Sequence, residues 1–281
     1  MTISTAYSRD LGDELRRVRE SCTGLTGRAL AVQLGWDPSK VSNIEHGRAR
    51  ASEIDLVQFL TLCGKDIDFF EEFRRRYRHA FDLYFVQVPD NLRTIAMAES
   101  MATKITAYDV VTIHGLVQTE AYARELFVET GIEAPEDIDR LIQLRVERQA
   151  IMRRHNRPEC VFYLHEIALQ VRFGDARLMA DQYLRLLFKT HVVRIVPTSA
   201  MKAVVQPKCT LFEFEKASPI AYTENSLAKV FAQDNAAVAR SRALFTHLDS
   251  IALDEEQSRS MLADYVSGLR GDSHDSRTDL A

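Results

Sequence analysis

Four side chains in one short segment could hydrogen-bond to another molecule in a fixed order. They are Ser39, Lys40, Ser42 and Asn43, and they lie just before Gly47. An amide such as Asn43 suits the N6 and N7 edge of adenine, and an ammonium such as Lys40 suits guanine. Hydroxyl groups can contact either kind of base edge. These residue types predict direct reading of DNA bases, provided that the segment is a helix that fits the major groove.

The segment before these side chains reads as a short helix. Thr26 is of the type that caps a helix N-terminus, and Leu30 and Leu34 follow at helical spacing. Gly35 can end the helix, because glycine adopts the left-handed cap conformation at little cost. A helix of two turns is therefore expected from Thr26 to Leu34.

The polar side chains belong to a second short helix. Asp37 is its expected N-cap, and Pro38 fits the first helical position, where a backbone N–H has no partner. Val41 and Ile44 are three residues apart and face inward, which leaves the polar side chains on the outside. Gly47 ends the helix. Residues 38–46 therefore form the helix that we expect to enter the major groove.

This order of caps, glycines and apolar positions resembles the Cro/CI-type (XRE) helix-turn-helix family. Its members have a pattern like L-T-x-x-x-L-A-x-x-L-G-x-S-P-S-x-V-S-x-I-E-x-G-x-R. The matching residues here are Leu25, Thr26, Leu30, Ala31, Leu34, Gly35, Pro38, Ser39, Val41, Ser42, Ile44, Glu45, Gly47 and Arg48. The resemblance implies a lambda-repressor-like domain of five helices, expected over residues 1–80.

The resemblance also implies roles for single residues. Ser39, Lys40, Ser42 and Asn43 would contact bases. The residues that would contact the DNA backbone are Arg19, Thr26, Gly27, His46, Arg48 and Arg50. Many relatives have Gln at the position of Gly27, so here that contact would come from its backbone N–H. An arginine of the first helix would pair with the glutamate before the last glycine, which maps onto Arg19 and Glu45.

The rest of the first 80 residues completes five helices. An apolar stripe predicts the first helix from about Leu11 to Ser21, Ser52 caps the fourth helix, and Asp66 starts the fifth. Four arginines lie between Arg74 and Arg78. They could contact phosphate, but a solvated helix end is preferred, because cations are favourable at a helix C-terminus.

A second group of motifs lies beyond an aromatic connector. Residues 81–106 are expected to form a packed helical connector, with a helix from Asn91 to Lys104. The segment from Ala107 to Phe127 resembles the "P-G-L-L-Q-T-E-x-Y-A" motif of actinobacterial regulators with an antitoxin-like C-terminal domain of unknown function, the WhiJ-like group. The matching residues are Gly115, Leu116, Gln118, Thr119, Glu120, Tyr122, Ala123, Leu144, Arg145, Glu147, Arg148, Gln149 and His165–Leu169.

The C-terminal half alternates apolar runs of strand length with helical patterns. Strands are expected at 161–164, 192–196, 209–215, 220–222 and 230–231, and helices at 178–188, 238–248 and 258–266. The fold class is therefore mainly α with a mixed α+β C-terminal half. An α+β regulatory domain is expected over residues 107–268, and a disordered polar tail over 269–281.

Composition limits the remaining possibilities. The chain has 281 residues and a net charge of −4; residues 1–80 hold thirteen Lys and Arg against twelve Asp and Glu, which leaves −5 for the rest. A locally cationic patch on a weakly acidic protein favours selective DNA binding over indiscriminate coating. No apolar run approaches the roughly 18 residues of a membrane span, and Arg9 and Asp10 interrupt any signal peptide. We therefore expect a cytoplasmic protein with no membrane contact.

Metal, cofactor and catalytic signals are weak. The four cysteines, Cys22, Cys63, Cys160 and Cys209, are scattered and predict neither a zinc site nor disulfides. A glycine-rich phosphate loop, G-x-S-x-G and H-E-x-x-H are all absent from the sequence. His165 and Glu166 are the best acid–base candidates, yet adjacent strand residues point to opposite faces. We expect no enzyme, no cofactor and no metal, and a packed or capping role for His114.

Three functions stay open, and they are compatible. The first is a sequence-specific transcriptional regulator that binds double-stranded DNA; its relatives act as homodimers, which predicts a two-fold operator with half-sites about one helical turn apart. The second is a toxin–antitoxin-like interaction protein whose C-terminal domain binds a small cognate protein partner. The third is a sensor in which a small-molecule effector occupies an apolar cavity of the C-terminal half.

Overall fold

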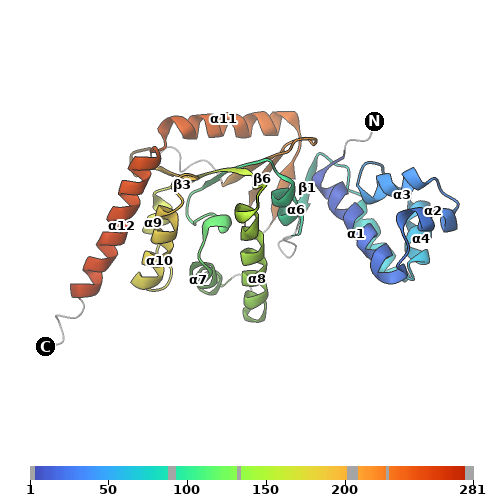
Figure 1. Ribbon diagram of the computed structural model, residues 1–281, viewed down its shortest axis with the longest axis horizontal. Helices are drawn as coiled ribbons and strands as arrows, with labels where there is room; N and C mark the ends of the chain where they lie inside the picture. The colour runs from blue at the N-terminus through green and yellow to red at the C-terminus, as the bar shows by residue number, and fades with distance from the viewer. Residues whose placement is uncertain (1–3, 88–92, 132–133, 201–207, 226–227, 276–281) are drawn as a thin grey trace.

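The computed structural model describes residues 4–87, 93–131, 134–200, 208–225 and 228–275. It has two parts (Figure 1). A group of helices lies at the N-terminal end, and a twisted sheet with helices on both faces makes up the remainder. The predicted fold class, a five-helix domain followed by a mixed α+β domain, is confirmed.

Five helices form the N-terminal domain. They are α1 (Ala6–Thr23), α2 (Gly27–Leu34), α3 (Pro38–Glu45), α4 (Glu53–Leu62) and α5 (Ile67–Tyr77). The caps read from the sequence are present, since Thr26, Asp37, Ser52 and Asp66 each accept a hydrogen bond from a backbone N–H of the first turn. Helix α1 starts earlier than expected, at Ala6, because Thr5 and Ser8 form a capping box.

Two glycines let α1 cross closely over the end of α3. A Cβ atom at Gly12 would lie 2.6 Å from the carbonyl oxygen of Ile44, and one at Gly47 would lie 2.3 Å from that of Ser8. Gly47 also has φ +62°, a conformation that costs other residues about 1–2 kcal/mol. The hydroxyl of Ser8 donates to the Gly47 carbonyl at 2.8 Å. The backbone that follows α3 therefore lies directly on α1.

Seven strands form one mixed sheet in the order β1-β7-β6-β5-β2-β3-β4. They are β1 (Tyr84–Gln87), β2 (Lys104–Asp109), β3 (Glu159–His165), β4 (Val193–Val196), β5 (Cys209–Glu213), β6 (Ile220–Glu224) and β7 (Lys229–Ala232). Strands β2, β3 and β4 are parallel, and the pairs from β1 to β2 along that order are antiparallel. The carboxyl ends of β2, β3 and β4 therefore meet at one edge of the sheet.

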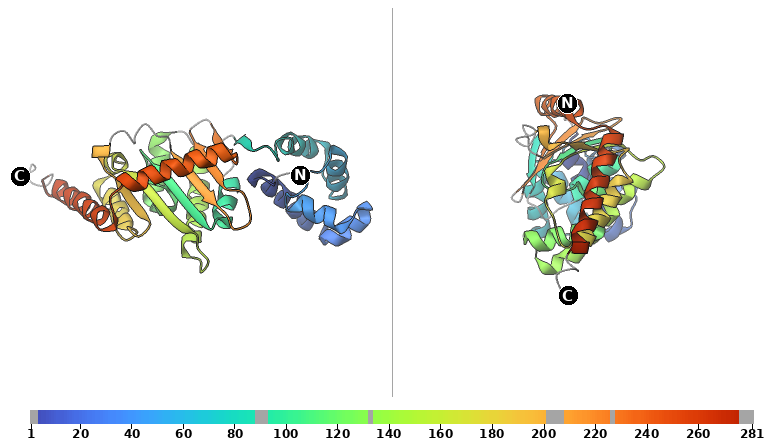
Figure 2. Two further views of the ribbon diagram at one scale, coloured as in Figure 1. Left: turned by 90° about the horizontal axis from the view of Figure 1, so that it is seen from above. Right: turned by 90° about the vertical axis from the view of Figure 1, so that its left-hand side faces the viewer.

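Helices cover both faces of this sheet (Figures 1 and 2). Helix α11 (Asn235–Ile251) crosses one face alone. The other face carries α6 (Arg93–Met101), α7 (Glu120–Thr130), α8 (Ile138–Gln149), α9 (Ile167–Gln170), α10 (Ala176–Leu187) and α12 (Glu255–Asp275). Helices α7 and α8 connect β2 to β3, and α9 and α10 connect β3 to β4, as parallel strands require.

The strands send alternate side chains into two apolar layers. Phe162 of β3 packs with the larger core, whereas its neighbour Tyr163 packs under α11 with Val196, Phe245 and Leu248. This period of two explains why short apolar runs in the sequence predicted strands. The larger core continues through Ile95, Ala98 and Ala102 into the N-terminal helices. The two parts of the molecule therefore share one apolar core.

Polar contacts also join the two parts. The backbone N–H of Ala6 donates to the side chain of Gln233, just after β7, at 2.8 Å. The hydroxyl of Thr94 on α6 donates to the carboxylate of Asp10 on α1 at 2.8 Å. Helix α1 is thus attached to the sheet domain at its N-terminal turn and in its second turn.

The segment expected to be a helical connector differs from the prediction. Residues 84–87 form strand β1 at the edge of the sheet, where it pairs with β7. The helix is described from Arg93 and ends at Met101, earlier than expected, because β2 begins at Lys104. Residues 88–92 lie outside the described residues. The polar tail expected to be disordered from residue 269 also differs, since α12 runs to Asp275. Residues 276–281 are outside the described part.

Two further findings come from the described ranges alone. Within them, every helix is too short or too polar to cross a lipid bilayer. The same ranges hold no group of three or more His, Cys, Asp or Glu side chains suited to a metal ion.

The close approach of α1 to the end of α3 generates a prediction about stability. Gly47→Ala should lower the free energy of unfolding by about 1–2 kcal/mol for the left-handed backbone and by about 1–3 kcal/mol more for overpacking. Gly35→Ala is the matched control, since Gly35 has φ +66° but open space around its Cα. Urea unfolding followed by the fluorescence of Trp36, the only tryptophan, measures both. Equal losses for the two variants would contradict the contact.

Candidate nucleic-acid interface

Helix α3 turns its polar side away from the core. Val41 and Ile44 are buried against α1 and α2, while Ser39 and Ser42 are exposed and Asn43 is partly exposed. The side chains of α3 therefore divide as the sequence predicted, with an apolar side inward and small polar groups outward. A helix of this size with that outer surface fits the dimensions of the major groove.

Lys40 is engaged inside the domain. Its ammonium lies 2.5 Å from Asp55 Oδ1 of α4 and 4.1 Å from the centroid of the Trp36 ring. The side chain is still 40% exposed, so this is a surface ion pair, which is worth little free energy. Trp36 is partly buried and packs on the core, as expected of a scaffold residue. Contact of Lys40 with a base would require it to leave Asp55.

A buried ion pair fastens α3 to α1. Arg19 Nε lies 2.6 Å from Glu45 Oε1, and Arg19 Nη2 lies 3.0 Å from Glu45 Oε2. The guanidinium also donates to the carbonyl of Leu25 at 2.5 Å and to Glu20 at 3.2 Å. The hydrogen bond with Glu45 raises the pKa of Arg19, in spite of its burial. Arg19 is only 5% exposed, so this geometry supports a bracing role and leaves little of the guanidinium for phosphate.

The other residues predicted to contact the DNA backbone surround α3. Thr26 caps α2, and the exposed His46 caps α3 with its Nδ1 2.7 Å from the Ser42 carbonyl oxygen. Arg48 is exposed and makes no hydrogen bond or ion pair with any described residue. Arg50 donates to the carbonyl of Arg78 at 3.3 Å and lies over the Phe81 ring. Arg48 is therefore the freest cation of the predicted set.

Gly27 is the first residue of α2. A Cβ atom there would lie 3.6 Å from the side chain of Val41 and 3.7 Å from the carboxylate of Glu45. The space therefore accepts a small side chain. The structure leaves the backbone N–H as the group that Gly27 could offer to DNA.

Arg28 was not among the residues predicted from the sequence to contact DNA. It lies in the first turn of α2, is exposed, and has no partner among the described residues. The signal was present, because a cation in the first turn of a helix is poorly placed for its own helix. A phosphate at the N-terminus of α2 would remove that conflict.

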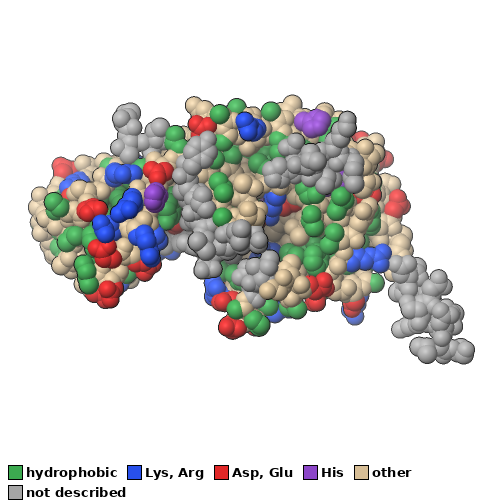
Figure 3. Space-filling view, turned by 180° about the vertical axis from the view of Figure 1, so that it is seen from behind, with side chains coloured by type: hydrophobic (Ala, Val, Ile, Leu, Met, Phe, Trp, Pro, Cys, Tyr) green, Lys and Arg blue, Asp and Glu red, His purple; other side chains and the backbone are tan. Residues whose placement is uncertain are grey.

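Charges of both signs are mixed over the N-terminal domain. Figure 3 shows Lys and Arg side chains gathered in one area of it, with acidic side chains beside them. Arg16 and Arg17 both pair with Asp13, and Arg76 makes two hydrogen bonds of 2.7 Å to Glu14. The solvated helix end preferred for residues 74–78 is thus partly an internal network of ion pairs.

The two candidates for acid–base chemistry have structural partners. Glu166 accepts hydrogen bonds from the Thr198 backbone and hydroxyl at 2.7 and 2.8 Å, and one from Tyr265 at 3.1 Å. His165 is fully buried, and its Nδ1 accepts from the backbone N–H of Ile167 at 3.2 Å. Burial lowers the pKa of His165. Glu166 therefore joins the end of β3 to α12 and to the loop after β4, whereas His165 contacts the turn that follows β3.

Two family models match this chain. One describes a helix-turn-helix domain and matches residues 10–72; the other describes a domain of unknown function, DUF5753, and matches residues 92–264, more than half of the chain. The chain belongs to the DUF5753 family. Neither model describes a catalytic family. Searches of curated proteins and of solved structures found no match.

The two matches fall on different parts of the fold. The helix-turn-helix match covers the helices around α3, and this domain points to DNA binding and hence to regulation of transcription. The DUF5753 match begins after β1 and ends within α12, so it covers six of the seven strands.

The buried pair between α1 and α3 generates the second prediction. Glu45→Ala should lower the free energy of unfolding by about 3–5 kcal/mol, because it leaves the Arg19 guanidinium buried without its carboxylate. Combining Arg19→Met with Glu45→Leu should recover part of that loss. Arg17→Ala is the control, since its pair with Asp13 is exposed. Trp36 fluorescence in urea measures all four proteins; a loss for Glu45→Ala no larger than that for Arg17→Ala would refute the role.

Proposed function

We propose that this protein is a sequence-specific transcriptional regulator that binds double-stranded DNA as a homodimer. Residues 1–80 bind DNA through α3, and residues 107–268 regulate that binding. The observation that carries the proposal is the outer side of α3, where Ser39, Ser42 and Asn43 are solvent-accessible. The opposite side of this helix is held against α1 by the ion pair between Arg19 and Glu45. Such a helix can enter the major groove without rearrangement of its own domain.

Each side chain then has a distinct role. Asn43 pairs with adenine, and Ser39 and Ser42 contact adjacent base edges. Lys40 exchanges the carboxylate of Asp55 for guanine, an exchange that costs little because the ion pair is on the surface. Arg48, the N-terminus of α2 and His46 position the DNA backbone. Arg50 could join them after leaving the carbonyl of Arg78.

A second function concerns the C-terminal domain, which we propose can bind a small cognate protein. A wide groove of about 730 Å³ lies between α11 and strands β6 and β7. Small and apolar residues line it, among them Ala221, Val230, Ala237 and Leu244. This groove is the surface on which such a partner would be sought.

Selection of bound duplexes from a random pool tests the main proposal. The wild-type protein should enrich an inverted repeat whose half-sites are about one helical turn, 34–36 Å, apart. Asn43→Ala should weaken binding to the enriched sequence by about 1–3 kcal/mol and relax one base position in each half-site. An enriched site that Asn43→Ala binds as tightly as wild type would show that α3 is not the reading helix.

The salt dependence of binding tests the backbone contacts separately. Arg48→Ala should weaken binding to specific and random duplexes alike, and should reduce the slope of log K against log salt by about one unit per subunit. Arg177→Ala is the matched control, because Arg177 on α10 is also exposed and without a partner among the described residues. Fluorescence anisotropy at several salt concentrations gives both slopes. A similar slope for both variants would place Arg48 away from phosphate.

A further inference from the structure

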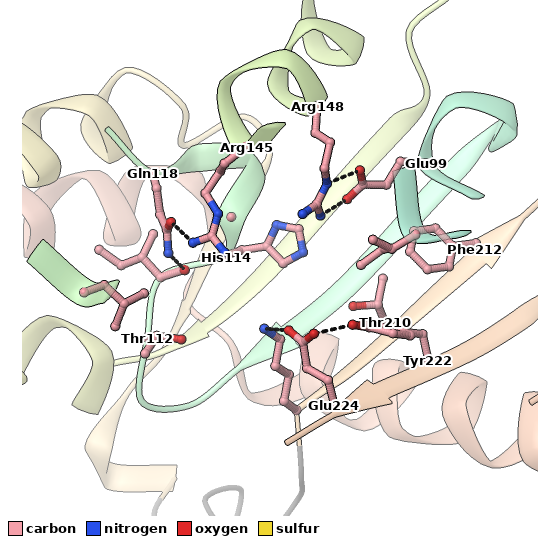
Figure 4. A pocket seen from close by; sticks show the side chains of 15 residues that line it. Glu99, Thr112, His114, Gln118, Arg145, Arg148, Thr210, Phe212, Tyr222 and Glu224 are labelled. Carbon is pink, nitrogen blue, oxygen red and sulfur yellow. Dashed lines mark hydrogen bonds and ion pairs between the residues drawn. The ribbon is translucent and has the colours of Figure 1, made fainter. Parts of the chain in front are cut away.

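A largely enclosed cavity of about 180 Å³ lies inside the sheet domain. Its wall is made by the loop after β2, by α6 and α8, and by strands β5 and β6 (Figure 4). A single water needs only roughly 10–15 Å³ of such space. The cavity is therefore large enough for a compact organic molecule.

Most charged side chains of this wall are paired with each other. Arg148 donates to Glu99 at 2.6 and 2.8 Å, and Glu99 is only 2% exposed. Lys208 lies 2.8 Å from Glu224, which also accepts the hydroxyl of Tyr222. Burial disfavours the charged form of Glu224, but Lys208 outweighs it and lowers the pKa of that carboxyl to about 2. The charges of Arg148 and Lys208 are therefore balanced by carboxylates of the protein itself.

Arg145 is the exception. Its Nη1 donates to the neutral amide of Gln118 at 2.6 Å, and its Nε is buried without a hydrogen-bond partner. No carboxylate among the described residues lies within ion-pair distance of it. Burial lowers the pKa of Arg145 only to about 10, so the guanidinium stays charged at neutral pH. A buried charge without a counter-charge is costly, unless something else supplies that charge.

Neighbouring amides hold Arg145 in place. Gln118 Nε2 donates to the carbonyl of Ile113 at 2.6 Å, and Gln149 Nε2 donates to the carbonyls of Gly115 and Gln118 at 2.8 and 3.0 Å. Gly115 packs under the guanidinium, since a Cβ atom there would lie 3.7 Å from Arg145 Nε. The guanidinium is thus preorganised on the wall of the cavity, beside Gln118 and His114 in Figure 4.

A second donor is available on the same wall. His114 Nδ1 accepts a hydrogen bond from the backbone N–H of Leu116 at 3.3 Å, which places the ring proton on Nε2. Burial lowers the pKa of His114 to about 3, so the ring is neutral. Phe212, Leu126 and Ile95 add apolar surface. The wall therefore combines one cation that has no carboxylate within ion-pair distance among the described residues, one neutral donor and an apolar region.

We propose that this cavity binds a compact organic anion, a carboxylate or phosphate bound by Arg145 with its apolar part against Phe212 and Leu126. A planar guanidinium can donate two parallel hydrogen bonds to such an oxyanion, which makes arginine the cation best suited to a carboxylate or phosphate. Gly115, Gln118, Arg145 and Gln149 all belong to the motifs by which the sequence resembles its relatives.

The site lies one helix away from the DNA-binding domain. Ile95 and Glu99 of α6 line the cavity, while Ala96, Met97 and Ser100 of the same helix line a groove beside α1. Anion binding nevertheless stands apart from the proposed DNA binding. It is tested without DNA, so that the failure of one proposal can be told from the failure of the other.

Calorimetric titration of the full-length protein with benzoate, phenyl phosphate and benzamide tests the proposal. Benzamide is the neutral analogue of benzoate. At least one anion should bind, and benzamide should bind at least about tenfold more weakly than benzoate if benzoate is the ligand type. A stronger response to phenyl phosphate would assign a phosphate group to the site. If neither anion binds, or if benzamide equals the bound anion, the proposal is wrong.

Two pairs of variants test whether the anion binds in this cavity. Arg145→Met should weaken the anion at least about tenfold, and Arg140→Met is its control, because Arg140 is an exposed arginine of the same helix. Should Arg145→Met fail to fold, Thr112→Phe fills the cavity without removing a charge, and Val111→Phe adds the same bulk at an exposed neighbour outside it. Thr112→Phe should abolish binding and Val111→Phe should preserve it. Unchanged binding in Arg145→Met or Thr112→Phe overturns the assignment.

Discussion

The ion pair between Arg19 and Glu45 fixes the orientation of α3, and the proposed DNA contacts depend on it. A two-turn helix has little stability of its own, so its direction is set by what it packs on. Here the guanidinium reaches α3 at Glu45 and the end of the α1–α2 turn at Leu25. One side chain thus positions two helices relative to α1. Gly12 and Gly47 also allow the backbone of α1 to contact the backbone at the end of α3.

Helix α1 in turn belongs to both parts of the molecule. The side chain of Gln233 accepts a hydrogen bond from the first backbone N–H of α1, and the Thr94 hydroxyl donates to Asp10. Apolar residues of α1, α6 and the sheet also belong to one continuous core. A DNA-binding domain on a flexible tether would have none of these contacts. The angle between α3 and the sheet is therefore set by packing, and a displacement of α6 would act directly on α1, with which it is in contact.

Much of the N-terminal domain could be predicted from the sequence, because the signals that define its helices are local. Caps such as Thr26, Asp37 and Ser52 act within three residues, so the helices around α3 could be placed from the sequence. Strand β1 could not, because it is short and its partner β7 lies far along the chain. The Lys40–Asp55 pair and the hydrogen bond from Arg145 to Gln118 are likewise non-local. The family motifs marked the residues of the cavity but gave no sign that they enclose one.

Strand β1 has a practical consequence for dissecting the protein. A cut between β1 and α6 would separate β1 from the sheet that it completes. A C-terminal fragment cut there would expose the N–H and C=O groups of β7, which invites pairing with a second copy. Apparent self-association of such a fragment would report the lost strand and not the assembly of the intact protein.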